Sequence, residues 1–209
     1  MKRMLISIVG TLSVGLAASL GQAQDKATGS IKGKITASGV KDVENVLVYV
    51  EKAPGDHPAP KDSAEMDQAK LTFVPNVLPI VKGTKVTFKN SDPVLHNVFW
   101  NKSEDGSYEA RNLGTWGKGA DTQFTFDKEG SVVLLCNVHP EMEGHIVVLQ
   151  NPFFALASKD GAYEIKDVPA GDYSVKAWYP NPKKLKAKTS PTTVTAGKAT
   201  QLDFSLSRK

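Results

Sequence analysis

Apolar and polar residues alternate with a period of two through most of this 209-residue chain, and this pattern restricts the fold more than any other feature. Ile31 and Ile35 alternate with lysines, for example, and Val46, Val48 and Val50 form a second such run. Successive side chains of a strand point to opposite faces, so alternation predicts strands buried on one face. No segment shows the period of an amphipathic helix. The sequence therefore predicts an all-β protein.

The expected strands are separated by Gly-containing turns at about the spacing found in β-sandwiches. Two of them, VVLLC and HIVVL, are apolar enough to be buried on both faces. Ala53 to Gln68 is rich in Pro, Ala and charge and is predicted to be a linker without strands, and Asn101 to Asp121 is predicted to be a long loop. The strands are expected near residues 31–35, 46–50, 71–75, 85–90, 123–126, 132–136, 145–149, 162–168, 172–179, 192–196 and 201–206.

Residues 1–23 have the pattern of a cleavable export signal. Lys2 and Arg3 precede an apolar stretch, and small residues follow at the expected cleavage site. The apolar stretch is shorter than the ~20 residues that span a bilayer, which favours cleavage over a membrane anchor. The sequence thus predicts a periplasmic protein with no membrane span in the mature chain. Without Lys2 and Arg3 the formal charge falls from +4 to +2, too small to indicate a nucleic-acid or anionic-membrane partner.

Cys136 is the only cysteine of the chain, whereas exported proteins usually pair their cysteines. It begins the sequence CNVHPEM, in which His139 and Met142 follow at intervals of three. Thiolate, thioether and imidazole ligands together favour copper, and a blue-copper site needs one Cys, two His and a weak axial Met. The second imidazole should come from a neighbouring strand. His96 follows a Pro turn and begins an apolar strand, so it is the candidate for this ligand. These four residues are the predicted metal ligands.

The sequence CNVHPEMEGHIVV resembles the copper loop of the cupredoxins, most closely that of the amicyanin type. Upstream, FVPNVLPIVKGTKVTFKNSDPVLHNV is similar to the cupredoxin pattern of strand, Gly turn, strand and His-Asn-Val. The resemblance covers residues 66–150 and implies a Greek-key β-sandwich that binds one copper ion cycling between Cu(II) and Cu(I). It implies His96, Cys136, His139 and Met142 as ligands, and it implies that Asn97 steadies the Cys loop through hydrogen bonds.

Because of three neighbouring residues, the sequence does not decide which side chains complete the ligand set. Glu141 and Glu143 flank Met142, and either carboxylate in place of the thioether would give a non-blue site. His145 is a further candidate ligand, although the apolar residues after it place it in a strand. Zinc also accepts Cys and His ligands, but it normally takes a harder fourth ligand than a thioether.

A second, smaller β-sandwich is expected from residues on both sides of the copper region. KDGAYEIKDVPAGDYSVKAWYP resembles the carboxypeptidase-regulatory-like (transthyretin-like) module, and residues 29–52 resemble its opening strands. The simplest arrangement joins residues 29–52 to residues 151–206, with residues 53–65 as a linker and the copper domain inserted between. Alternatively, the first strands complete the copper domain. The whole resembles exported methylamine-utilisation or plastocyanin-like proteins, although Asn76 stands where that group usually has His.

The expected function is one-electron transfer to and from an unidentified redox partner protein. No catalytic triad or phosphate loop is evident, and a site with four ligands has no open position for substrate, so we expect a carrier and not an enzyme. Two alternatives remain: a copper-handling or sensing protein with a carboxylate ligand, and a metal-free structural scaffold. Four lysines between Lys183 and Lys188 indicate either a docking patch for an acidic partner or, more simply, a solvated loop.

Overall fold

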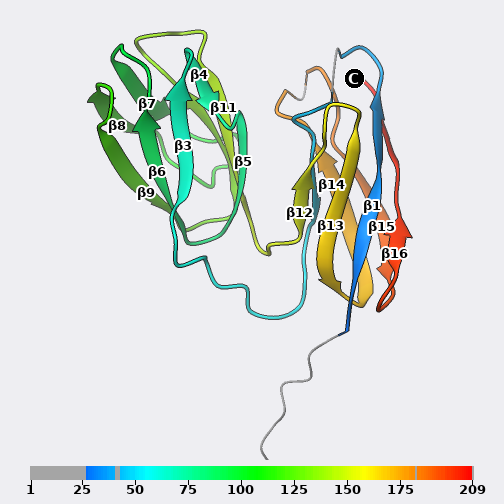
Figure 1. Cartoon of the computed structure of the whole chain (residues 1–209). Helices are drawn as coiled ribbons and strands as arrows, with labels where there is room; N and C mark the ends of the chain where they lie inside the picture. The colour runs from blue at the N-terminus through cyan, green and yellow to red at the C-terminus, as the bar shows by residue number, and fades with distance from the viewer. Residues whose placement is uncertain (1–26, 41–42, 182, 209) are drawn as a thin grey trace, which may run out of the picture.

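The computed structural model describes residues 27–40, 43–181 and 183–208 (Figure 1). All regular elements of these residues are β-strands, which confirms the all-β prediction. The export signal expected at residues 1–23 lies outside the described residues. Within the described ranges, no helix is long and apolar enough to cross a membrane.

The strands form two sandwiches that stand side by side (Figure 1). The first sandwich packs a five-stranded sheet, in the order β5-β11-β10-β7-β8, against a four-stranded sheet, in the order β4-β3-β6-β9. Its core holds large side chains such as Phe88, Trp100 and Phe126, all at most 1% exposed. The strands are β3 (Ala64–Ala69), β4 (Thr72–Val74), β5 (Val77–Val81), β6 (Thr84–Asn90), β7 (His96–Trp100), β8 (Arg111–Trp116), β9 (Asp121–Phe126), β10 (Gly130–Leu135) and β11 (Glu143–Leu149).

The second sandwich is built from the two ends of the chain. One sheet contains β13, β1, β16 and β17, and the other has the order β12-β2-β14-β15. Because β1 pairs with β13, β16 and β17, and β2 pairs with β12 and β14, residues 28–50 share this sandwich with residues 154–206. The strands are β1 (Thr28–Ala37), β2 (Leu47–Val50), β12 (Phe154–Leu156), β13 (Ala162–Pro169), β14 (Gly171–Trp178), β15 (Lys188–Val194), β16 (Ala199–Gln201) and β17 (Phe204–Leu206).

A third apolar cluster joins the two sandwiches. Leu47 of β2 is fully buried against Val77 of β5 and against Val147 and Leu149 of β11, and Trp178 packs at its margin. As a result β11 is buried on both faces for most of its length, as its sequence predicted. The sandwiches therefore contact each other through apolar side chains and not only through the connecting chain.

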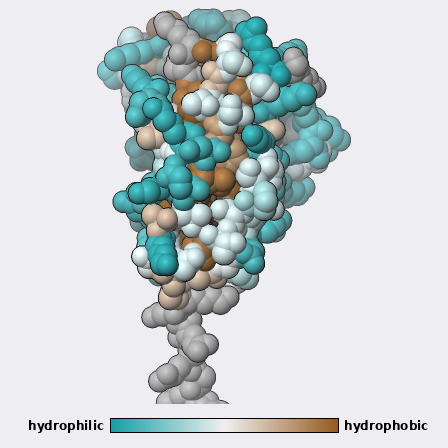
Figure 2. Space-filling model, turned by 90° about the vertical axis from the view of Figure 1, so that its right-hand side faces the viewer, coloured by the Kyte–Doolittle hydropathy of each residue, from teal (hydrophilic) through white to brown (hydrophobic). Residues whose placement is uncertain are grey.

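The edge of the second sandwich that faces away from the first has no broad apolar surface. Figure 2 looks onto this side of the molecule and shows mainly hydrophilic and neutral residues flanking a narrow hydrophobic strip. None of the large exposed hydrophobic side chains of the described residues lies in β15, β16 or β17. Lys188 and Pro191 lie in edge strand β15, and such residues oppose strand pairing between molecules.

Four local expectations were wrong. Strand β3 lies partly within the predicted linker Ala53–Gln68, and β8 lies within the predicted loop Asn101–Asp121. Leu71, expected in a strand at residues 71–75, occupies a tight turn with φ of 58° and is 41% exposed. Strand β10 is open on one face, where Val133 is 43% exposed, and is not buried on both.

Candidate metal centre

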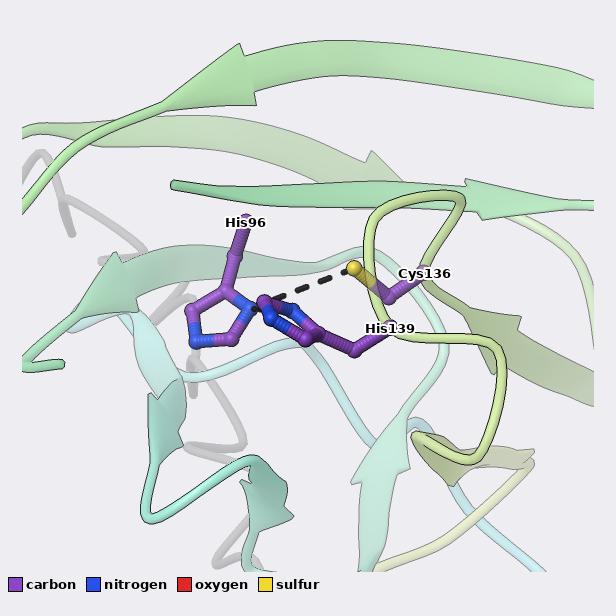
Figure 3. Close-up of side chains that lie close together, drawn as sticks. All are labelled: His96, Cys136 and His139. Atoms are coloured by element: carbon purple, nitrogen blue, oxygen red, sulfur yellow. Dashed lines mark hydrogen bonds between the residues drawn. The ribbon is translucent and has the colours of Figure 1, made fainter. Parts of the chain in front are cut away.

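Three of the four predicted ligands converge at one end of the first sandwich (Figure 3). His96 is the first residue of β7, Cys136 directly follows β10, and His139 lies in the loop that leads to β11. His96 and Cys136 are buried, at 0% and 3% exposure, whereas His139 is partly exposed. The end of one strand, the start of another and a short loop thus present an imidazole, a thiol and a second imidazole to a common point.

The distances between the donor atoms fit a single metal ion. His96 Nδ1 lies 3.1 Å from His139 Nδ1 and 3.9 Å from Cys136 Sγ, and one donor atom from each residue lies within 4.8 Å of the others. An ion about 2.0–2.3 Å from nitrogen and sulfur donors can bridge atoms up to roughly 4.3 Å apart, a limit that both distances from His96 satisfy. One thiolate with two imidazoles is a soft donor set suited to copper. The residues present therefore fit a copper ion.

Asp92 determines how the His96 ring is presented. Its carboxylate accepts a hydrogen bond from His96 Nε2 at 2.9 Å, which leaves the lone pair of the neutral ring on Nδ1, the atom that faces Cys136 and His139. The same carboxylate accepts hydrogen bonds from the backbone N–H groups of Lys70 and Leu71. These bonds, led by that from Leu71, and the His96 contact lower the pKa of Asp92. The carboxylate thus stays ionised and fixed beside the ring.

Asn97 connects the Cys loop to the sheet, as the resemblance implied. Its backbone N–H donates to Cys136 Sγ at 3.4 Å, and its side-chain oxygen accepts from the N–H of Asn137 at 3.3 Å. Its amide nitrogen donates to Asn112 Oδ1 and to the carbonyl of Gly114 in β8. From the opposite sheet, fully buried Gln68 donates to the Asn97 carbonyl at 3.2 Å. Both sheets therefore hold the residue that contacts the sulfur.

Met142 is 1% exposed and belongs to the same buried cluster as Cys136. Its backbone N–H donates to the carbonyl of His139 at 3.0 Å, which closes the loop between these residues. Glu141 and Glu143 are exposed. The Glu143 carboxylate lies 3.2 Å from Nε2 of His145, a buried residue that also contacts the Trp178 ring of the second sandwich. His145 is not part of the His96–Cys136–His139 group.

The contact between Asp92 and His96 predicts a weaker metal site in an Asp92→Asn variant. An amide can present its NH₂ group to Nε2 and so favour the wrong tautomer, and loss of such a partner typically lowers metal affinity about 10–100-fold. Titration with Cu(I) against a competing chelator measures this change. Asp67→Asn is the matched control, because Asp67 bonds Gln68 and Ser91 in the same region without touching the ring. An unchanged affinity in Asp92→Asn would show that the carboxylate does not position His96.

Burial of His145 between the sandwiches predicts a stability loss in mild acid. Desolvation lowers the pKa of His145 below its usual 6.5, although Glu143 partly opposes this shift. Well above pH 6.5 the ring is neutral in both the folded and the unfolded state. As the pH drops below 6.5, the unfolded chain takes up the proton first. The free energy of unfolding therefore decreases as the pH decreases. Urea unfolding of the metal-free protein between pH 7.5 and 5 should show a smaller decline for His145→Gln. Equal declines would contradict this assignment.

The sequence patterns did not identify Asp92, Gln68 or Asn112 as part of the centre. For Asp92 a signal was present, since a carboxylate four residues before a ligand His in a Pro-containing turn can fold back onto the ring. For Gln68 and Asn112 there was none, because their contacts depend on the pairing of β3 with β6 and of β8 with β7. Both side chains meet Asn97 from strands that are distant in sequence.

A match to one family model agrees with this chemistry. Residues 60–149 match the model of the family of copper binding proteins, plastocyanin/azurin family. No curated protein matches the chain. Similar solved structures include a copper-containing nitrite reductase from Thermus scotoductus, at 27% identity and a TM-score of 0.40 over 47% of this chain and 25% of that one. This chain thus spans about a quarter of that enzyme.

Two further similar structures are an amicyanin variant and a cupredoxin. A reduced amicyanin variant is 22% identical with a TM-score of 0.39, over 48% of this chain and 97% of that one. A purple cupredoxin from Nitrosopumilus maritimus is 25% identical with a TM-score of 0.36, over 41% of this chain and 99% of that one.

Proposed function

We propose that this protein, whose residues 60–149 match the model of the plastocyanin/azurin family, is an exported type 1 copper protein that carries single electrons. The observation that carries the proposal is the convergence of His96 Nδ1, His139 Nδ1 and Cys136 Sγ on one point. Bound copper would supply a one-electron couple, Cu(II)/Cu(I).

The residues around the centre suit electron transfer in distinct ways. His96 and Cys136 are buried and held by Asp92 and Asn97, so the ligand geometry changes little when the charge of the site changes. His139 is partly exposed and provides the route between the metal and a partner. Large hydrophobic side chains are exposed at this end, in the turns and loops and at the end of β4, namely Leu71, Val74, Val94, Leu95 and Val138. They form an apolar rim through which a partner protein can exclude water.

Met142 is the fourth ligand in this proposal, in preference to a glutamate. Its side chain is buried in the cluster that contains Cys136, whereas Glu141 and Glu143 are exposed and the Glu143 carboxylate is paired with His145. A carboxylate would have to leave water or its partner to reach the buried site, and that desolvation is costly. A set of three strong ligands and one weak one has no open position for a substrate, which supports a carrier and not an enzyme.

Met142→Gln should keep copper bound and shift the reduction potential, because the axial ligand tunes the potential of such sites. Protein-film voltammetry measures the shift. Glu141→Gln and Glu143→Gln are the matched controls and should leave the potential close to that of the wild type. A larger shift in either glutamate variant than in Met142→Gln would assign the axial position to that carboxylate, and the copper-handling alternative would then be favoured.

The carrier function is tested by repeated oxidation and reduction of the copper-loaded protein. Voltammetry should show one reversible one-electron wave that is unchanged by oxygen or nitrite. Catalytic current with either oxidant would indicate an enzyme. Export is tested separately: the N-terminal sequence of the protein recovered from a periplasmic fraction should begin near Gln24, and recovery of the intact N-terminus would contradict it.

A further inference from the structure

Four lysines follow β14, three of them within residues 183–187 and Lys188 at the start of β15. The Asn181 side-chain oxygen accepts hydrogen bonds from the N–H groups of Lys183 and Lys184, and the Asn181 carbonyl accepts a bond from Leu185. Leu185 is fully buried in the core of the second sandwich, and Lys186 N–H donates to the carbonyl of Ser207. Hydrogen bonds therefore hold the backbone of residues 183–186, while the side chains of Lys183, Lys184, Lys186 and Lys188 are exposed.

These four lysines, here called the lysine loop, carry uncompensated charge. None of them has an ion-pair partner among the described residues, whereas Lys52, Lys89, Lys102 and Lys176 are all paired. The molecule is also bipolar. The first sandwich is acidic: residues 53–150 contain 9 Lys and Arg and 13 Asp and Glu, which gives a formal charge of −4. The second sandwich is basic: residues 29–52 and 151–209 together contain 14 Lys and Arg and 8 Asp and Glu, which gives a formal charge of +6. The lysine loop is the densest part of the positive half.

The lysine loop lies near the metal centre. A groove of about 490 Å³ between the sandwiches is lined by Lys183 on one side and by Leu135 and Glu143 on the other. Leu135 directly precedes Cys136, and Glu143 directly follows Met142. In Figure 1 the loop after β14 and the start of β11 lie at the same end of the molecule. At an ionic strength of about 10 mM the Debye length is about 30 Å. Under this condition the positive charge of the lysine loop acts on a partner protein that is bound at the metal end.

We propose that the lysine loop docks the acidic surface of an electron-transfer protein whose redox group then reaches the metal centre. This inference rests on the proposed function. The metal end has few lysines near its apolar rim, namely Lys70 beside Leu71 and Lys118 beside Gly117, which lies against Leu95, and the acidic Glu141 and Glu143 lie beside the proposed ligands. The second sandwich therefore supplies the positive charge that the first sandwich lacks. The electron balance is simple: the donor is oxidised by one electron and bound Cu(II) is reduced to Cu(I).

The test uses the soluble acidic haem domain of cytochrome b5 as the probe. Basic cytochrome c serves as the control protein of opposite charge. In the test variant all four lysines of the loop are replaced by glutamine. In the matched control Lys32, Lys159, Lys166 and Lys198, which are exposed elsewhere on the second sandwich, are replaced instead, so both variants lose the same charge. Binding is measured with metal-free protein by calorimetry at about 10 mM ionic strength, and reduction of the copper-loaded protein is followed by stopped flow.

Replacement of the four lysines should weaken binding of the acidic haem domain roughly tenfold or more. It should slow electron transfer from this domain by a similar factor. Both effects should disappear near 1 M salt. The control variant should lose much less, and reactivity with cytochrome c should not fall. Equal losses in the two variants, or none, would overturn the proposal. Binding through these lysines to anionic phospholipid vesicles, with no binding to the haem domain, would overturn it as well. Because the binding assay needs no copper, its result stands even if the metal centre is not of type 1.

Discussion

Cys136→Ala is expected to abolish the intense visible absorption of the copper-loaded protein and to weaken Cu(II) binding sharply. The sulfur lies 3.9 Å from His96 Nδ1 and accepts a hydrogen bond from the backbone of Asn97, so it is the soft donor of the site. Alanine leaves two imidazoles and a thioether, which bind copper without a thiolate-to-metal transition. Absorption spectroscopy and metal titration measure both effects.

The fold should survive this substitution, because the removed atom is one sulfur at the edge of the core. Val138→Ala is the matched control: Val138 lies between Cys136 and His139 in the loop and is 45% exposed, so its loss should leave the colour unchanged. If Cys136→Ala keeps the colour, the thiolate is not a ligand, and the ligand set proposed here is wrong.

Leu47→Ala is expected to have the largest effect on stability of the changes considered. Leu47 is fully buried in the cluster between the sandwiches, where Val77, Val147 and Leu149 surround it. Removing a buried leucine side chain typically costs about 2–5 kcal/mol, from lost burial and from the cavity that remains. Urea unfolding of the metal-free protein measures this loss without a contribution from metal binding.

Leu156→Ala provides the matched control, because Leu156 pairs with Leu47 in neighbouring strands but is 37% exposed. Its substitution should cost well under half as much. If both variants lose the same small amount, the cluster between the sandwiches does not stabilise the protein. A two-step transition in Leu47→Ala, with only the second sandwich unfolding early, would show that the sandwiches unfold separately once this contact is weakened.

Alternation predicted most strands because their buried faces are apolar. It failed for β3, where the buried face contains Met66 and the polar Gln68, so that the pattern resembles a polar linker. It failed for β8, an edge strand that contains Gly114 at a positive φ of 102° and lies opposite a register shift in β7. An edge strand with little burial has no apolar face to reveal it.

The candidate ligand loop could be predicted from the sequence because its candidate donor residues lie close together in the chain. Cys136, His139 and Met142 lie within seven residues, and only His96 required pairing across strands. Contacts that depend on register were hidden: Gln68 and Asn112 reach Asn97 from other strands. The packing of Leu47 against β11 was hidden for the same reason, since it depends on how one sheet lies on another.

Visible absorption and EPR spectra of the purified protein after addition of one equivalent of Cu(II) test whether the site is of type 1. We expect an intense blue colour with narrow copper hyperfine splitting, the signature of a Cys-His-His site with a weak thioether. A weakly coloured or red species with wide splitting would place a carboxylate or water at the metal in place of Met142. Failure to bind copper at all would rule out the proposed copper site and leave the metal-free scaffold.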